Sequence, residues 1–434
     1  MPAFEMQDQH DRQEPLGTNQ APASSPNSAS SPVSALSPNL RVAVFSGNYN
    51  YVRDGANMTL NRLVAYLERQ GIPVRVYSPT TDTPAFEPAG TLISVPSIPI
   101  PRRREYRIAL GMPRSVREDL ARFNPTIIHL SAPDLLGYAA QRHARRLGIP
   151  VVASFHTRFE TYLQYYGLDF LKSAVLRYMR HFYNRCAQIY APSTCTADSL
   201  RGEGISQPLR IWSRGVDRRQ YHPGRRDWGW RQSLGIGPDE VVLLFVGRLV
   251  LEKGLDVLAN LSDTLEKRGV SHKVLIVGEG PERAPMQERL PGAIFTGFLA
   301  GDDLSRAYAS ADIFINPSTT EAFGNVTLEA MASGLPCICA DATGSRSLVV
   351  PGNNGYLITP TSLEDYVSRT ADLITNDSLR RQMGASGRKL SAQYDWDNVM
   401  ETLVGHYREV LALHAANTPS PDLTPEGAHA HIAR

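Results

Sequence analysis

The sequence predicts an α/β protein made of two doubly wound parallel sheets, and two observations support this prediction. Short apolar runs alternate with longer segments in which apolar residues recur every three or four positions, as in strands that alternate with helices. This alternation begins near residue 40 and starts again near residue 241, which indicates two domains of the same kind. Because ligands of open parallel sheets bind at the carboxyl ends of the strands, we expect the two domains to face a central cleft.

The first half carries apolar runs of strand length and amphipathic runs of helix length. In the helix expected over 56–70, for example, Leu60, Leu63, Val64 and Leu67 follow helical spacing. Another helix is expected over 137–147. The expected strands of this half are 41–46, 74–79, 127–131, 151–156, 188–193 and 209–217.

The second half repeats the pattern. Its expected strands are 241–247, 273–280, 293–298, 312–318 and 335–341. We place the boundary at 215–217, which gives a first domain over 39–215, a second over 216–395 and a final helix over 396–413 that packs back. The tails, 1–38 and 414–434, are predicted to be disordered, because the composition of the first is Ser- and Pro-rich and that of the second is similar.

Composition narrows the class of protein. The formal net charge of the 434 residues is +2, which excludes a generally basic nucleic-acid binder. Four scattered cysteines do not suit a disulfide framework, and we expect them in a reducing compartment. No run approaches the roughly 20 apolar residues of a membrane-spanning helix, and the N-terminus does not resemble a signal peptide. We therefore expect a cytoplasmic protein.

The segment 319–336, TTEAFGNVTLEAMASGLP, is the most informative stretch for chemistry. Glu321 lies in a loop after an expected strand, Gly324 interrupts the regular backbone, and a helix is expected to open near Asn325 with Glu329 in its second turn. Free N–H groups at a helix start suit a bound anion, and a carboxylate set back from them can accept hydrogen bonds from a ribose diol. The alternative is that both glutamates are solvated surface residues.

A second stretch, FVGRLVLEKG over 245–254, places fixed positive charges after a strand. Arg248 follows the strand at once and Lys253 comes five residues later. A diphosphate leaving group needs such charges at the edge of the sheet when no metal is present. Two basic residues after a strand can also be merely solvated, so spacing alone leaves both interpretations open.

Three weaker motifs follow other strands. His156 ends a strand of the first half, where a lone histidine is often structural, and Gly55 precedes a helix at a place where a loop can approach a phosphate. Gly278 and Gly280 also follow a strand, but they do not form the GxGxxG pattern, and Pro281 stands where the helix would open. A nicotinamide cofactor is therefore poorly supported.

Taken in this order, these motifs resemble the retaining glycosyltransferases of family 4, which have the GT-B fold of two Rossmann-like domains facing a cleft. The similarity covers about 40 to 413. Its most specific element is the pair Glu321 and Glu329, eight positions apart within AFGNVTLEAMASGLP, together with Gly247-Arg248 and Lys253-Gly254.

The resemblance implies roles for these residues. Glu329 would hold the ribose hydroxyls, Arg248 and Lys253 would bind the diphosphate, and Glu321 and His156 would contact the donor sugar. It further implies a substrate-binding role for Gly55 in the first loop, for Gly297 and Phe298 near the base, and for Phe323, Gly324, Asn325 and Val326 around the helix start. Front-face attack is the mechanism implied, with no assigned protein nucleophile, no metal and no cofactor beyond a nucleotide diphosphate sugar.

Within the family, SFHTRFETYL and LRIWSRGVD look most like GDP-mannose-dependent α-mannosyltransferases and sulfoquinovosyl-diacylglycerol synthases. We therefore expect a hexose, best mannose from GDP-mannose, to be moved to a lipid or lipid-linked glycan acceptor. The alternatives are a UDP-sugar-dependent glycolipid synthase, a sugar-nucleotide epimerase on the same fold, or a nucleotide-sugar-binding protein without activity. One literal DxD, Asp395-Trp396-Asp397, precedes a helix, where we expect Asp397 to be the N-cap rather than a metal ligand.

Two basic stretches of the first half suggest peripheral membrane association. They are PRRREYR over 101–107 and FLKSAVLRYMRHFYNR over 170–185, the second a mixture of apolar and basic residues on an expected helix. A basic amphipathic surface of this kind can dock on anionic lipid. The alternative is an ordinary solvated helix face. We place such docking at the inner face of the cytoplasmic membrane.

Overall fold

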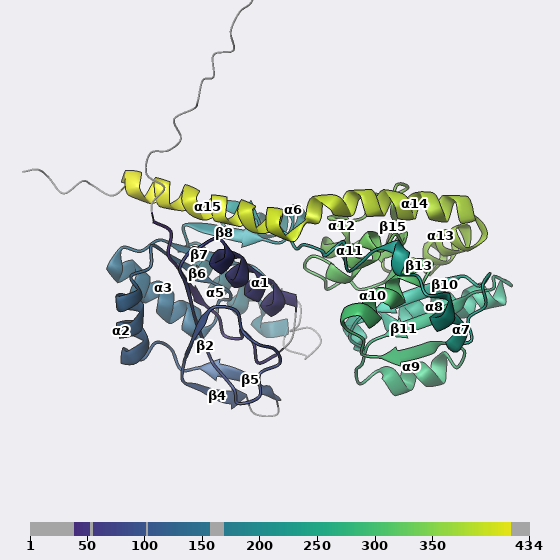
Figure 1. The fold of residues 1–434 in the computed structure, drawn as a ribbon, viewed down its shortest axis with the longest axis horizontal. Helices are drawn as coiled ribbons and strands as arrows, with labels where there is room; N and C mark the ends of the chain where they lie inside the picture. The colour runs from purple at the N-terminus through teal and green to yellow at the C-terminus, as the bar shows by residue number, and fades with distance from the viewer. Residues whose placement is uncertain (1–38, 53–54, 101–102, 157–168, 418–434) are drawn as a thin grey trace, which may run out of the picture. The chain divides into compact units, whose positions relative to one another are not determined.

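A computed structural model describes residues 39–52, 55–100, 103–156 and 169–417. Within these residues the chain forms two parallel sheets, one in each half, with helices in the connections between strands (Figure 1). The prediction of two doubly wound sheets is therefore confirmed. The expected tail 1–38, residues 418–434 of the expected tail 414–434, and the stretches 53–54, 101–102 and 157–168 lie outside the described residues. Residues 414–417, expected to be disordered, instead belong to the final helix.

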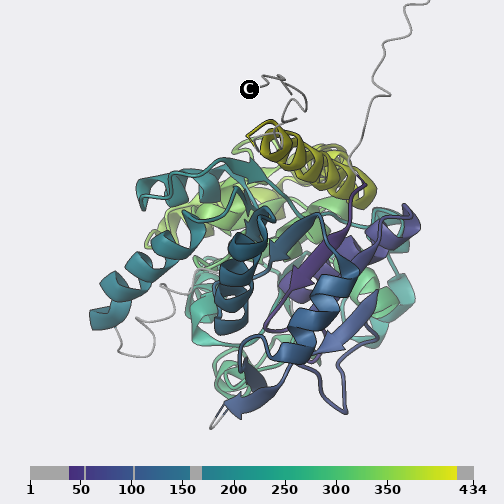
Figure 2. The ribbon, with the colours of Figure 1, turned by 90° about the vertical axis from the view of Figure 1, so that its left-hand side faces the viewer.

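The first sheet has the strand order β3-β2-β1-β6-β7-β8-β9, and its neighbouring strands pair in parallel. Helices cover the sheet on both faces (Figure 2). Its elements are β1 (Val42–Phe45), α1 (Gly55–Arg69), β2 (Val74–Ser78), β3 (Thr91–Ser94), the antiparallel hairpin of β4 (Ser97–Ile100) and β5 (Arg103–Ala109), α2 (Arg114–Phe123), β6 (Ile127–Leu130), α3 (Leu135–Leu147), β7 (Val151–Ser154), the short helix η2 (Asp169–Leu171), α5 (Lys172–Tyr183), β8 (Gln188–Ala191), α6 (Thr194–Gly202) and β9 (Leu209–Ile211).

The second sheet has the order β12-β11-β10-β13-β14-β15 and is also parallel. Its elements are the short helix η3 (Pro223–Arg225), α7 (Trp228–Ser233), β10 (Val242–Val246), η4 (Leu251–Lys253), α8 (Leu255–Lys267), β11 (Lys273–Val277), α9 (Arg283–Arg289), β12 (Ile294–Gly297), α10 (Gly301–Ala309), β13 (Ile313–Asn316), α11 (Asn325–Ala332), β14 (Cys337–Ala340), α12 (Thr343–Arg346), β15 (Gly355–Ile358), α13 (Leu363–Thr375), α14 (Asp377–Leu390), η5 (Ser391–Tyr394) and the final helix α15 (Trp396–Asn417).

The direction in which strands are added reverses once in each sheet. The reversal falls between β1 and β6 in the first sheet and between β10 and β13 in the second. At such a point the loops leaving two neighbouring strands turn to opposite faces and leave room between them at the carboxyl edge. The loops after β10 and β13 carry Arg248, Lys253 and Glu321, so the topology of the second sheet places them at its reversal point.

The final helix α15 packs against the first sheet although it follows the second in the chain. Its buried Leu403, Val404 and Tyr407 belong to the same core cluster as Val44 of β1. His129 of β6 lies beneath the helix, where its ring nitrogens contact the hydroxyls of Tyr407 and Ser154. Burial lowers the pKa of His129 to about 3, so this ring stays neutral inside the core.

Some elements differ from the prediction. The strands β3, β4, β5 and β15 were not expected, β9 ends at Ile211 rather than continuing to 217, and α15 continues through Asn417 instead of ending at 413. Asp395, not Asp397, caps α15, since its Oδ1 accepts from the backbone N–H groups of Asp397 and Asn398 at 3.0 and 3.3 Å. Asp397 instead pairs with Arg69 at 2.7 Å, so the expectation that Asp397 is the N-cap was wrong.

Candidate functional site

The loops after β10 and β13 meet through an ion pair. Lys253 Nζ contacts Glu321 Oε1, and the two side chains keep only 17% and 22% of their surface exposed. A second contact joins the same loops, because the hydroxyl of Ser318 donates to the carbonyl of Glu252 at 3.4 Å. The structure thus brings together two residues that the sequence placed 68 positions apart, at the reversal point of the second sheet.

Glycine is required where these loops enter their helices. Gly254 has φ +69° at the start of α8, and a Cβ there would lie 2.9 Å from the carbonyl oxygen of Pro317. Gly324 has φ +92° immediately before α11. Neither helix start is capped by a side chain, so backbone N–H groups at both starts remain available to an anion.

Arg248 extends from the end of β10 into solvent. Its side chain is 63% exposed, and its guanidinium lies 3.9 Å from Glu252 Oε1, a long and weak contact. The guanidinium is therefore free to turn toward a ligand, whereas Lys253 is already held by Glu321. The two cations therefore lie in the same loop, Arg248 exposed to solvent and Lys253 held in an ion pair.

Glu329 lies in the second turn of α11 and is partly buried. The hydroxyl of Tyr308 donates to its Oε2 at 2.9 Å. Burial raises the pKa of Glu329 to about 7, against the opposing effects of Tyr308, the Arg62 guanidinium and the Tyr221 hydroxyl. Near pH 7 the protonated and ionised forms of this carboxyl are therefore both populated. Further hydrogen-bond donors would favour the ionised form.

The residues around the start of α11 differ in whether their backbone or their side chain can reach a ligand. The Phe323 side chain points into the core, where it packs edge-to-face on Tyr394 with ring centroids 5.8 Å apart, so only its backbone can reach a ligand. Val326 is partly buried, and its carbonyl accepts from Tyr308 at 3.2 Å. Asn325 keeps a buried Oδ1 without a hydrogen-bond partner among the described residues.

Gly55 of the first half approaches this helix start. A Cβ on Gly55 would lie 2.7 Å from Nδ2 of Asn325, so the first residue of α1 and the first residue of α11 are in close contact. A further contact between the halves joins Thr196 Oγ1 to the carbonyl of Ala322 at 3.1 Å. The neighbouring Arg53 and Asp54 of the first loop lie outside the described residues.

Gly297 and Phe298 lie at the end of β12, two strands away from β10 on the same carboxyl edge. Phe298 is 66% exposed, so its ring is accessible to a ligand at this edge. The glycines of the neighbouring loop serve packing: a Cβ on Gly278 would lie 1.9 Å from the carbonyl oxygen of Gly247, and one on Gly280 would lie 2.2 Å from that of Leu249.

His156 lies two residues beyond β7 and is held by a partner that the sequence analysis did not name. Arg214 donates from Nη2 to His156 Nδ1 at 2.8 Å, and its Nη1 donates to the carbonyl of Trp212 at 3.2 Å. Burial and the adjacent guanidinium lower the pKa of His156 well below its usual value. Because Nδ1 accepts, the neutral ring must carry its proton on Nε2.

The Nε2 atom of His156 is buried and has no hydrogen-bond partner among the described residues. Its neighbours Thr157–Glu160 in the SFHTRFE motif lie outside them. In the described part of the chain, no hydrogen bond or ion pair links His156 to Lys253, Glu321 or Glu329. It therefore offers a single N–H donor on the first half, separate from the loops of the second.

Three functional candidates were missed at the level of sequence. Arg214 orients His156, Tyr308 binds Glu329, and Arg62 of α1 acts on Glu329 from the first half while its guanidinium lies 4.4 Å from the ring centre of Trp396. Only Arg214 had a sequence clue, because it lies three residues after β9 in the SRGVD stretch. Tyr308 and Arg62 sit inside helices, where nothing in the sequence distinguishes them from neighbouring polar residues.

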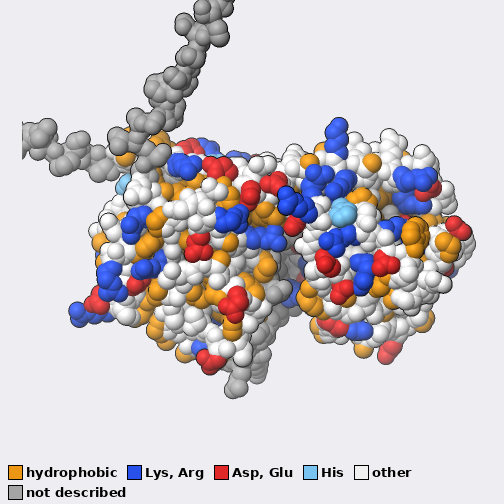
Figure 3. Space-filling model, in the orientation of Figure 1, with side chains coloured by type: hydrophobic (Ala, Val, Ile, Leu, Met, Phe, Trp, Pro, Cys, Tyr) orange, Lys and Arg blue, Asp and Glu red, His pale blue; other side chains and the backbone are white. Residues whose placement is uncertain are grey.

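The described residues were also searched for other features. They hold no group of three or more His, Cys, Asp or Glu side chains arranged to bind a metal ion. None of their helices is both long enough and apolar enough to cross a bilayer. On the face seen in Figure 3, basic and acidic side chains are interspersed over both halves, consistent with the small net charge.

Comparison with known proteins identifies the chain's relatives. A family model described as "Glycosyltransferase Family 4" matches residues 53–220, and one described as "Glycosyl transferases group 1" matches 227–390. The chain is 34% identical to a GDP-mannose-dependent alpha-mannosyltransferase of Corynebacterium glutamicum, over 86% of this chain and 90% of that one. It is 31% identical to the sulfoquinovosyl transferase SQD2 of Arabidopsis thaliana, over 83% and 72%.

The fold is that of GT-B glycosyltransferases. Among solved structures, sucrose-phosphate synthase from Thermosynechococcus elongatus superposes with a TM-score of 0.73 at 20% identity, covering 86% of this chain and 100% of that one. At this identity the likeness concerns the fold alone. The expected fold class is therefore confirmed.

Proposed function

The chain belongs to glycosyltransferase family 4, and from this premise we propose that it transfers a hexose from a nucleotide diphosphate sugar to a lipid or lipid-linked acceptor with retention of the anomeric configuration. The single observation that carries the proposal is the Lys253–Glu321 pair at the reversal point of the second sheet, beside two uncapped helix starts. The cation and the helix starts can bind the anionic part of the donor, and the carboxylate can contact its sugar.

Lys253 and Arg248 are proposed to bind the diphosphate. The charge that builds up on the leaving nucleotide is largest in the transition state, so fixed cations at that place lower the barrier. Lys253 is held in position before the donor arrives, which reduces the cost of reorganisation. With two cations and the N–H groups of α8 and α11 available, a metal ion is not needed for this role.

Glu329 is proposed to accept hydrogen bonds from the ribose hydroxyls. The Tyr308 hydroxyl donates to Oε2 and the Tyr221 hydroxyl also acts on the carboxyl, and a carboxylate with about four acceptor positions keeps room for a diol. Two hydroxyl donors favour the ionised carboxylate and so lower its raised pKa on binding. Phe298 and Gly297, two strands away on the same edge, are proposed to lie near the base, where the exposed ring offers a stacking surface.

His156 is proposed to contact the donor sugar from the first half. Arg214 holds its ring neutral with the proton on Nε2, so the residue acts as a hydrogen-bond donor to a sugar hydroxyl and not as a base. Glu321 meets the sugar from the other side. The acceptor hydroxyl attacks the anomeric carbon on the face from which the diphosphate departs, and the departing phosphate oxygen takes its proton. No side chain serves as nucleophile in this scheme.

The acceptor proposal is supported by the relatives and by one surface of the first half. The SQD2 relative is by its name a sulfoquinovosyl transferase, and the other is by its name a mannosyltransferase that uses GDP-mannose. On this chain η2 and the start of α5 expose Phe170 (77%) and Leu171 (38%) next to Lys172 and Arg177. Apolar side chains beside cations suit docking on an anionic membrane surface, at the inner face of the cytoplasmic membrane.

The first candidate for the donor is GDP-mannose, because a relative whose similarity spans 86% of this chain is named for it. A UDP-sugar-dependent glycolipid synthase is the second candidate, favoured by the 31% identity to SQD2. A donor screen separates them. The purified protein is incubated with GDP-mannose, UDP-glucose or UDP-sulfoquinovose and membrane lipid extract, and the product is analysed by NMR for its anomeric coupling.

We expect one donor to give an α-linked glycolipid, with Lys253→Ala as the inactive control. A β-linked product from the α-configured donor would refute retention. Conversion of the nucleotide sugar without transfer would favour the epimerase alternative. Tight donor binding with no turnover over the acceptor panel would favour the inactive binding protein.

A further inference from the structure

A basic cavity lies at the opposite edge of the first sheet from His156. Its volume is about 480 Å³, within the range of ligand sites. Ile149, Pro150 and Val151 line it where the chain enters β7, whereas His156 follows the other end of that strand. The four residues of β7 alone span roughly 10 Å, so the cavity is separate from the proposed donor site.

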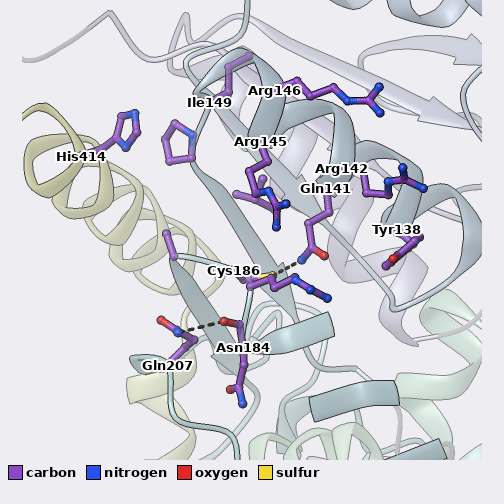
Figure 4. A pocket seen from close by; sticks show the side chains of 14 residues that line it. Tyr138, Gln141, Arg142, Arg145, Arg146, Ile149, Asn184, Cys186, Gln207 and His414 are labelled. Carbon is purple, nitrogen blue, oxygen red and sulfur yellow. Dashed lines mark hydrogen bonds between the residues drawn. The ribbon is translucent and has the colours of Figure 1, made fainter. Parts of the chain in front are cut away.

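Four arginines line this cavity, and no aspartate or glutamate does. Arg142, Arg145 and Arg146 project from the second half of α3, and Arg185 follows the end of α5. Figure 4 shows the three α3 arginines beside Gln141 and Tyr138. All four are exposed, and none forms an ion pair with a carboxylate of the described residues. By contrast, Arg75 of β2 lies 2.9 Å from Asp119.

The walls of the cavity are held by amide side chains, which leaves the guanidinium groups free. Gln141 donates to the carbonyl of Phe182 at 2.9 Å and to Cys186 Sγ at 3.3 Å, and Gln207 donates to the carbonyl of Asn184 at 3.0 Å (Figure 4). His414 of α15 contacts the carbonyl of Gly148 at 2.8 Å. The frame is therefore fixed, while each arginine retains N–H donors for a ligand.

The C-terminal ends of α3 and α5 offset only part of the positive charge of these four arginines. Arg145 and Arg146 lie in the last turn of α3, where the negative end of the helix dipole favours a cation. Arg142 lies a turn earlier, and Arg185 lies beyond the Asn184 C-cap of α5. Each helix end is equivalent to about half a negative charge, so two ends leave most of the positive charge of four guanidinium groups uncompensated.

We propose that this cavity is a second anion site, which binds a ligand bearing two or more phosphoryl oxygens close together, either a free diphosphate or the headgroup of an anionic phospholipid. Guanidinium groups bind phosphate in bidentate fashion, and four of them lining one cavity without a carboxylate match a ligand of high negative charge. The proposal does not depend on the donor assignment, because no residue of the cavity belongs to that site.

The test uses the full chain and inorganic pyrophosphate as the probe. Because pyrophosphate can also enter the proposed donor site, calorimetric titration is carried out on wild type and on Arg248→Ala/Lys253→Ala. We expect pyrophosphate binding to persist in Arg248→Ala/Lys253→Ala. In the same background, Arg142→Gln/Arg185→Gln is expected to weaken it about tenfold or more, as for the loss of charge-assisted hydrogen bonds. The three substituted arginines are exposed, whereas Lys253 is largely buried in its pair with Glu321, and an unchanged Tm verifies the fold of each variant.

A matched control removes two exposed cations from the first half of α5. Lys172→Gln/Arg177→Gln deletes the same charge outside the cavity and should leave pyrophosphate binding unchanged. Flotation with phosphatidylcholine vesicles, with and without phosphatidylglycerol, distinguishes the two sources. Loss of binding to the anionic vesicles in Arg142→Gln/Arg185→Gln alone, without pyrophosphate binding, would assign the cavity to a lipid headgroup. Equal losses of pyrophosphate binding in both double variants, or unchanged binding of both pyrophosphate and anionic vesicles in Arg142→Gln/Arg185→Gln, would overturn the proposal.

Discussion

The two sides of the proposed donor site are built differently. On the second half, Lys253 and Glu321 are supplied by loops after two adjacent strands, and each lies within a short motif that also supplies the glycine for its helix start. On the first half, His156 depends on Arg214, which lies 58 positions away in the loop after β9 and is itself buried. Motifs therefore reveal cations and carboxylates at strand ends, while the protonation state of a functional histidine is set by a long-range contact that no local pattern contains.

The largest expected effect tests the second half. Lys253→Ala removes the cation held beside the donor phosphates, and we expect kcat to fall by roughly 10²–10³-fold, the scale seen when one preorganised electrostatic group is deleted. Steady-state kinetics with the identified donor measure this, and Lys253→Arg, which keeps the charge, should retain part of the activity. A kcat within twofold of wild type would show that the second half is not organised around this residue.

The next effect tests the first half. Arg214→Met keeps much of the buried volume but frees His156 Nδ1, so the ring is no longer restricted to the Nε2–H form. We expect kcat/KM to fall roughly 10–100-fold, with Arg214→Lys less affected because it keeps a donor. The informative comparison is a double-mutant cycle: His156→Ala/Arg214→Met should be no worse than His156→Ala alone. Additive losses would mean that Arg214 acts independently of the histidine.

A third prediction concerns Glu329 and pH. With its pKa near 7 in the free protein, the carboxylate form that accepts ribose hydroxyls becomes populated as pH rises, so donor affinity should improve with pH. If only this form binds, affinity rises roughly fivefold from pH 6 to pH 7 and less than twofold from pH 7 to pH 8. Glu329→Gln should weaken binding roughly tenfold and remove the pH dependence. A slope that survives in Glu329→Gln would assign the titration to another group.

The smallest effect tests where the two halves touch. Gly55→Ala places a methyl group 2.7 Å from the Asn325 amide, which must turn away from its present position at the start of α11. Because the displaced atom is the end of a flexible side chain, we expect only a roughly threefold rise in KM for the donor, with an unchanged Tm. Adding Asn325→Ser shortens the opposing side chain and should remove the increase. No change in either variant would mean that this approach does not shape the site.

The sequence was sufficient for the sheet pattern and for residues fixed by local backbone geometry. Gly324 was expected to interrupt the regular backbone before α11, and its φ is +92°. The pairing of Lys253 with Glu321 was not predicted, because it depends on the adjacency of β10 and β13 in the sheet. The strand β15 was missed because the short stretch Gly355–Ile358 carries no clear periodic pattern. Tyr308 was missed because its contact with Glu329 depends on how α10 packs against α11.

Side-chain direction was the other limit of sequence reasoning. Phe323 occupies an expected site position, yet its ring packs into the core against Tyr394, so at most its backbone serves the ligand. The same limit explains the interchange of Asp395 and Asp397 at the start of α15: both are acidic residues at the right place, and only the backbone direction selects which of them accepts from the N–H groups.

Calorimetric titration of GDP and of UDP measures most directly whether the cations of the second half hold the departing nucleotide. The account predicts that one of the two binds wild type, that Arg248→Ala/Lys253→Ala weakens this affinity by about 100-fold or more, and that Arg142→Gln/Arg185→Gln leaves it unchanged. Equal affinity of wild type and Arg248→Ala/Lys253→Ala for the preferred nucleotide would contradict it.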